Sequence, residues 1–91
     1  MAELKETWTR HGNDVVSNNM AGLMGDFTPA GMTKAMAIAT NPIVATKFEV
    51  TDLGNNEVEI DYIGEKSRKI WSKWEETSPG KWQIVDLTDK G

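Results

Sequence analysis

The sequence has 91 residues and no cysteine, and its 10 Lys and Arg residues against 14 Asp and Glu give a net charge of -4. This length fits one domain, and the lack of cysteine excludes disulfides, thiolate metal sites and a thiol nucleophile. The acidic balance argues against nucleic acid as a partner, because phosphate binding needs concentrated Lys and Arg. The chain opens with charged residues and has no long apolar stretch. We therefore expect no signal peptide, no membrane partner and a cytoplasmic location.

Helical periodicity marks the first part of the chain. Apolar residues recur at helical spacing from Leu4 to Val16, and His11 falls on the same face. Asn19 is placed to cap a short second helix over residues 20–24. We expect Gly25 to end that helix.

A third helix is predicted to begin at Thr28 and Pro29. Thr28 can accept a hydrogen bond from the first turn, and Pro29 occupies a position that needs no donor. The helix should run to about Thr40, because the residue before Pro42 is pushed out of the helical region.

Methionines recur one turn apart in the second and third helices, as Met20 with Met24 and Met32 with Met36. Such pairs commonly fill irregular gaps in a core. The alternative is an adaptable binding face.

Beyond Ile43 the apolar period changes from 3.6 to 2, and β-branched and aromatic residues replace Ala and Met. Turn residues divide this part into four predicted strands, which span residues 44–51, 57–63, 67–77 and 81–88. The chain is therefore predicted to be a single α+β domain over residues 1–91, with two to three N-terminal helices packed on an antiparallel sheet of about four strands.

The third and fourth strands carry apolar residues at both alternating positions. A four-residue loop around Pro79 would place one set of side chains on the same face of the sheet: Ile70, Ser72, Trp74, Val85 and Leu87. The opposite face would carry Trp71, Trp82 and Ile84, with Lys73 opposite Asp86. A three-residue loop would shift the pairing by one and exchange the faces. Since one face meets the helices, we expect the other to meet a second subunit, a ligand or a curl of the same sheet.

His11 is the only histidine, so no second imidazole or thiolate can form a metal site with it. It is interpreted as a hydrogen-bonded core or boundary residue, with a pocket acid or base as the alternative. Asp14, one turn away, is its nearest carboxylate, whereas Asp26 is interpreted as a capping or loop group.

The carboxylates of the second strand, Glu57, Glu59 and Asp61, share one face. Cross-strand pairing with Lys and Arg explains them better than a metal ion does. No phosphate loop, nucleophile elbow or zinc-protease helix is present, so we expect no metal and no cofactor and assign no catalytic residue.

Two stretches resemble the nuclear-transport-factor-2-like superfamily, which includes SnoaL-like proteins and ketosteroid isomerases. One runs from His11-Gly12-Asn13-Asp14 to Asp26-Phe27-Thr28-Pro29-Ala30-Gly31. The other runs from Trp71 to Leu87 and contains the hairpin Trp74 to Gly80-Lys81-Trp82-Gln83-Ile84-Val85. The resemblance implies a curved sheet wrapped around helices, a pocket inside it, and dimerisation through the outer face of the sheet. No catalytic residue is carried over from the family.

We therefore predict a non-enzymatic homodimer that binds a small apolar ligand or a protein partner. The expected lining of a pocket is Trp8, His11, Phe27, Phe48, Ile60 and Tyr62, and the expected dimer interface is Trp71, Trp82 and Ile84. Two alternatives are a purely structural interaction module with no cavity and a small isomerase or lyase of the SnoaL or ketosteroid-isomerase type. In the isomerase or lyase, His11 or Asp61 would be the acid or base and Tyr62 a hydrogen-bond donor.

Overall fold

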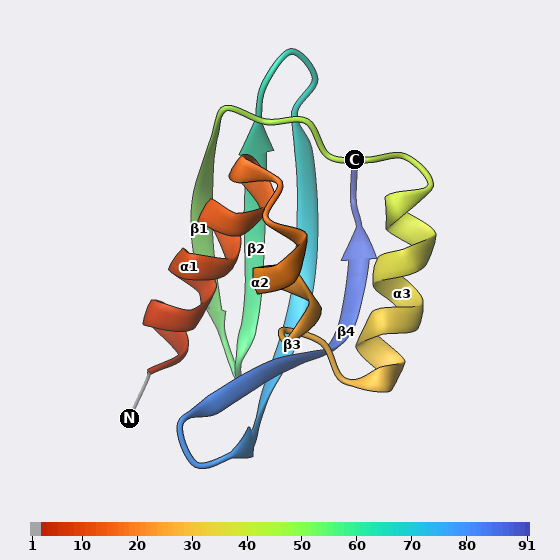
Figure 1. The fold of residues 1–91 in the computed structure, drawn as a ribbon. Helices are drawn as coiled ribbons and strands as arrows, with labels where there is room; N and C mark the ends of the chain where they lie inside the picture. Colours follow the sequence, from red (N-terminus) through yellow and green to blue (C-terminus); the bar gives the residue numbers. More distant parts are fainter. Residues whose placement is uncertain (1–2) are drawn as a thin grey trace.

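The computed structural model describes residues 3–91 and confirms the predicted α+β class, with helices first and a curved antiparallel sheet after them (Figure 1). The helices are α1 (Leu4–Ser17), α2 (Met20–Met24) and α3 (Pro29–Ala39). The strands are β1 (Lys47–Gly54), β2 (Glu57–Ile63), β3 (Arg68–Ser78) and β4 (Lys81–Asp89), paired in the order β1-β2-β3-β4. All three helices lie on one face of the sheet, with α1 over β1 and β2 and α3 along β4 (Figure 1).

Local sequence signals set the helix ends. Asn18 closes α1 in the left-handed conformation, with φ of 58°. The side chain of Asn19 accepts from the Gly22 amide at 3.3 Å, and that of Thr28 accepts from the Gly31 amide at 3.2 Å. Both predicted N-caps are therefore confirmed.

Two tight turns connect the paired strands. Asn55 and Asn56 join β1 to β2, and both have positive φ, as a two-residue hairpin turn of the mirror-image type requires. Pro79 and Gly80 join β3 to β4, with Ser78 paired to Lys81. The loop between β3 and β4 therefore has two residues rather than four.

A bulge in β4 changes which side chains face the helices. Lys73 pairs with Asp86 as predicted, but the next pair is Trp74 with Ile84, so Val85 is an extra residue in the strand. Ile84 consequently turns to the helix side, where none of its surface is exposed. The sequence-based prediction that Ile84 lies on the outer face was wrong.

Trp82 was assigned to the wrong face for the same reason. Trp82 pairs with Glu76, and this pair lies two residues from the pair of Trp74 with Ile84. Residues two apart on a strand share a face, so Trp82 is also on the helix side, where it packs against the buried core. Of the three predicted interface residues, only Trp71 lies on the outer face. There its indole Nε1 donates to Glu57 at 3.1 Å, and Lys73 and Lys90 form ion pairs with neighbouring glutamates. The outer face is therefore mainly charged, rather than apolar as expected.

The segment between α2 and α3 covers part of the outer edge of β4. The Ile84 amide donates to the Asp26 carbonyl at 2.7 Å, and the Thr28 amide donates to the Ile84 carbonyl at 3.1 Å. These bonds extend the sheet by a short parallel bridge between Phe27 and Ile84. They also fix the backbone that carries the Asp26 side chain.

Candidate functional site

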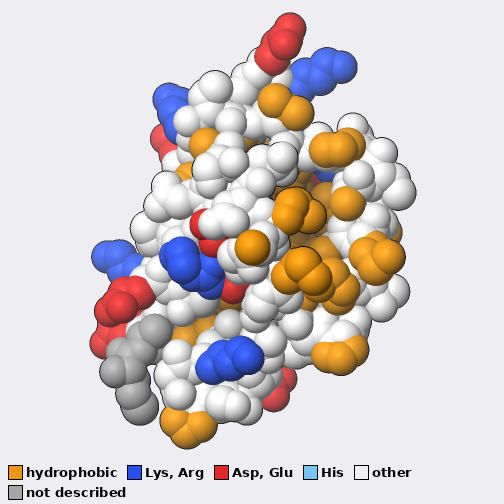
Figure 2. Space-filling view, viewed as in Figure 1, with side chains coloured by type: hydrophobic (Ala, Val, Ile, Leu, Met, Phe, Trp, Pro, Cys, Tyr) orange, Lys and Arg blue, Asp and Glu red, His pale blue; other side chains and the backbone are white. Residues whose placement is uncertain are grey.

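A cavity of about 490 Å³ opens between the α1–α2 pair and α3, above the inner face of the sheet. Its floor is formed by Tyr62, Ile70 and Leu87 of three different strands. Its walls are largely apolar: Val15, Leu23, Phe27, Ala35, Ile38, Ala39 and Ile43, with four methionines, Met20, Met24, Met32 and Met36. Figure 2 shows hydrophobic side chains gathered around its mouth, between α2 and α3. Met20, Met24 and Met36 are exposed there.

The cavity remains open because the inward side of α3 carries small residues. Ala35 and Ala39 line it and extend only one carbon from the backbone. The first turn of α3 lies directly against β4. The approach is so close that a Cβ on Gly31 would lie 2.1 Å from the Ile84 carbonyl oxygen. Farther along the helix, alanine leaves space that flexible methionines only partly fill.

His11 projects from α1 toward the cavity and is 5% exposed. Its Nδ1 lies 2.8 Å from Oδ2 of Asp26, which is also buried. Its ring makes edge-to-face contacts with Phe27 and Trp74, with centroid distances of 5.9 and 5.4 Å. A carboxylate and two aromatic rings thus fix the orientation of the imidazole.

Asp26 is held from its other side by Arg10, which also binds Asp14 at 2.6 Å. Burial raises the pKa of the Asp26 carboxyl, but the hydrogen bonds from His11 and Arg10 outweigh burial and lower the pKa below its ordinary value. Asp26 is therefore ionised at neutral pH and can only accept hydrogen bonds. It follows that Nδ1 of His11 carries the proton of the His11–Asp26 bond.

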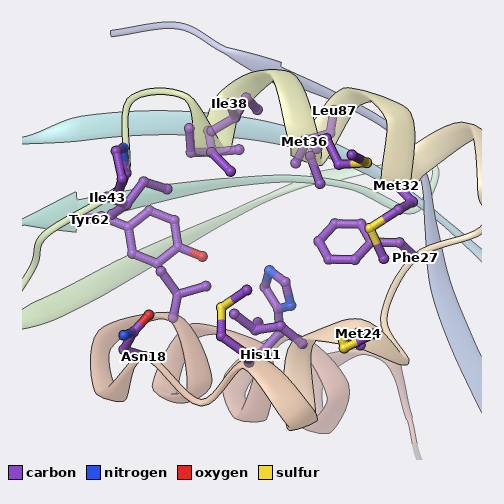
Figure 3. Close-up of a pocket in the computed structure, with 17 residues that line it drawn as sticks. His11, Asn18, Met24, Phe27, Met32, Met36, Ile38, Ile43, Tyr62 and Leu87 are labelled. Carbon is purple, nitrogen blue, oxygen red and sulfur yellow. The ribbon is translucent and has the colours of Figure 1, made fainter.

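Nε2 of His11 faces the cavity. Within residues 3–91 the structure gives this nitrogen no hydrogen-bond partner. In the same range, every side-chain nitrogen or oxygen that is fully enclosed does have a partner. Nε2 must therefore reach the open surface of the cavity that His11 lines. Figure 3 shows the ring pointing into the space between the helices and the sheet.

Tyr62 brings a second polar atom to the same space. Its side chain is 2% exposed, and its ring packs against Phe48 with centroids 6.5 Å apart. The hydroxyl points into the cavity (Figure 3) and has no hydrogen-bond partner in the part of the chain that the structure describes. Burial, and secondly the negative charge of Asp26, raise the pKa of the phenol. Tyr62 is therefore a neutral hydrogen-bond donor at physiological pH.

Three of the six predicted pocket residues line the cavity: His11, Phe27 and Tyr62. Trp8 and Ile60 are buried in the core instead. Phe48 packs against α1, where a Cβ on Gly12 would lie 2.5 Å from its ring.

The carboxylate partner of His11 differs from the expected one. Asp26, interpreted from sequence as a capping or loop group, binds the imidazole, whereas Asp14 pairs with Arg10. Asp61 occupies the position of β2 next to Tyr62, so its side chain is on the opposite, outer face of the sheet.

Sequence reasoning also left the four methionines and Asn18 out of the pocket. The methionine spacing was a usable signal, since two pairs one turn apart on consecutive helices can face one another. No group of three His, Asp or Glu side chains that could hold a metal ion occurs within residues 3–91. Over the same residues, no helix is long and apolar enough to cross a membrane.

No family model, curated protein or solved structure matches this chain.

Proposed function

We propose that this protein is a binding domain for a small, mainly apolar ligand held between the α1–α2 pair and α3. One observation carries the proposal: a cavity of about 490 Å³ with apolar walls and two buried polar side chains, His11 and Tyr62, directed into it. Pockets for small organic ligands are typically about 300–1,000 Å³, with apolar walls and a few polar groups that fix orientation. Of the two expected partners, a small molecule or a protein, the cavity favours the small molecule.

Blocking the cavity tests this function. Ala35 lines the cavity, whereas Ala37 is exposed on the same helix and does not line it. We expect Ala35→Phe to weaken binding of the neutral fluorescent probe 1-aminoanthracene by about tenfold or more, and Ala37→Phe to leave it unchanged. Equal affinities of the two variants would place the probe elsewhere and reject the proposal.

A second candidate function is proton transfer on a bound carbonyl compound, as in a small isomerase or lyase. The His11–Asp26 pair favours it, because a carboxylate-oriented imidazole with a cavity-facing Nε2 is the arrangement of a general base. Tyr62 would donate to the carbonyl oxygen, and Asp61 on the outer face has no part. Deuterium exchange next to the carbonyl of 2-tetralone, followed by NMR, should be accelerated by the protein and not by His11→Gln. No acceleration by the unmodified protein would reject this candidate for such ketones.

The homodimer, the cytoplasmic location and membership of the nuclear-transport-factor-2-like superfamily are further proposals. Helices that precede a curved sheet, with a pocket between the two layers, support the family resemblance. A dimer through the outer face of the sheet has only Trp71 of its three predicted residues to support it. Native mass spectrometry of the purified protein counts the subunits and reveals any retained small molecule in one spectrum.

A further inference from the structure

The polar groups of the cavity specify more about its ligand than its apolar walls do. Of the lining residues, His11, Asn18 and Tyr62 have polar side chains, and Asn18 is exposed at the rim. His11 and Tyr62 are buried and reach into the same space, and Tyr62 lies on the side of the cavity opposite Met24 and Met32 (Figure 3). A bound molecule would therefore place one polar end against His11 and Tyr62 and its apolar body among the methionines and Phe27.

The hydrogen bonds already made determine what these two side chains still offer. Nδ1 of His11 donates to the ionised Asp26, so in the neutral form of the imidazole it is the lone pair of Nε2, an acceptor, that is presented to the cavity. The Tyr62 hydroxyl offers a donor. An acceptor and a donor directed into one cavity are complementary to a group that can both donate and accept through one oxygen, which is the property of an alcohol or phenol.

The surrounding charges disfavour an anionic ligand. Asp14 and Asp26 carry two negative charges against the single positive charge of Arg10, so this cluster is net negative when His11 is neutral. The charge of Asp26 raises the pKa of Tyr62, which shows that its negative potential extends to the phenol oxygen. A carboxylate placed against Tyr62 would meet the same potential.

An ether or a ketone satisfies only half of the site. Its oxygen accepts from Tyr62, but it has no hydrogen to give to Nε2, which would be covered and left without a partner. A hydroxyl satisfies both groups.

We propose that the cavity selects a neutral, largely apolar molecule with one hydroxyl group, whose O–H donates to Nε2 of His11 and whose oxygen accepts from Tyr62. This rests on the proposed ligand-binding function.

Four probes with one aromatic body separate the contributions: naphthalene, 2-methoxynaphthalene, 2-naphthol and 2-naphthoate. Their affinities for the unmodified protein are measured by isothermal titration calorimetry at a fixed pH. We expect 2-naphthol to bind about tenfold more tightly than 2-methoxynaphthalene, since the difference is one buried hydrogen bond, and 2-naphthoate to bind more weakly than 2-naphthol. Tyr62→Phe, which removes only the hydroxyl, should abolish the preference for 2-methoxynaphthalene over naphthalene.

The outcomes distinguish the two proposals. Equal affinities for naphthalene, 2-methoxynaphthalene and 2-naphthol, all lost in Ala35→Phe, would retain the ligand-binding function and overturn the hydroxyl preference. Tightest binding of 2-naphthoate would overturn it in favour of an anionic head group. If none of the four binds, both proposals fail. The comparison of 2-naphthol with 2-methoxynaphthalene needs no variant, so it stands even if Tyr62→Phe does not fold.

Discussion

The inner face of the sheet has a closed half and an open half, although both are built from apolar strand residues. In the closed half Trp74 is 1% exposed and donates through Nε1 to the Ser72 hydroxyl at 2.9 Å. In the open half Tyr62, Ile70 and Leu87 form the floor of the cavity. The exposed fraction of the strand residues does not distinguish the two halves, because Tyr62, Ile70 and Leu87 are buried as well.

The difference comes from the side chains that face the sheet. Trp8 of α1 contributes a large ring to the closed half, whereas Ala35 and Ala39 of α3 contribute a single carbon each to the open half. An apolar pattern thus predicts that a face is covered, but the volume of the covering residues decides whether the result is a core or a pocket.

The largest effect should come from emptying the closed half. We expect Trp74→Ala to lower the free energy of unfolding by about 3–5 kcal/mol, because it removes a fully packed ring and leaves a cavity. Urea unfolding followed by circular dichroism measures the loss. A loss below about 1 kcal/mol would mean that the closed half is not tightly packed, and the contrast between the halves would disappear.

A second test separates α3 from β4. Gly31→Ala should cost about 3 kcal/mol, because its Cβ would meet the Ile84 carbonyl oxygen at 2.1 Å and the helix would have to shift. Gly25→Ala is the matched control, since a Cβ there has no neighbour within 4 Å and φ is negative. Similar unfolding free energies for the two variants would contradict the close seating of α3.

The boundary between the halves is held by the His11–Asp26 pair, which makes stability depend on pH. The pKa of Asp26 is lowered below 3.8 in the folded protein, so its contribution is fully present above about pH 5 and is lost as the pH falls through the folded pKa. We expect Asp26→Asn to cost about 2 kcal/mol at pH 7. The difference from the unmodified protein should shrink as the pH approaches 3. An undiminished difference at low pH would show that the carboxylate charge is not what stabilises the pair.

The smallest effect is expected at the mouth of the cavity. Met36 is 66% exposed, so Met36→Ala should change the free energy of unfolding by no more than about 0.5 kcal/mol. The same substitution should weaken binding of 1-aminoanthracene, because Met36 lines the cavity. A large loss of stability without loss of binding would show that Met36 belongs to the core.

Local features of the fold were predictable from the sequence because local signals determine them. The caps at Asn19 and Thr28 and the change of apolar period after Ile43 correctly indicated three helices followed by four strands. The β4 bulge was missed because strict alternation was assumed. The inward-facing residues Trp82, Ile84 and Leu87 are two and then three positions apart, and this break in alternation is the sequence signal of the bulge.

The site was less accessible to prediction because its parts are distant in the sequence. His11, Phe27 and Tyr62 were named as pocket residues, but His11 was matched with Asp14 on its own helix. Asp26 reaches His11 because the backbone bonds of residues 26–28 to β4 hold this segment beside α1. No local pattern encodes that contact.

The bridge between residues 26–28 and β4 also determines where the chain can change in length. The Asp26 carbonyl is fixed by the Ile84 amide while its carboxylate binds His11, so one added residue between Gly25 and Asp26 would have to be absorbed without moving either bond. The connection from α3 to β1 is constrained too, because the Asn41 carbonyl accepts from Arg68 and Ile43 lines the cavity, whereas Glu65, Lys66 and Ser67 between β2 and β3 are exposed. Peptide tags, labels or a circular break in the chain therefore belong at residues 65–67, and the segment before α3 should keep its native length.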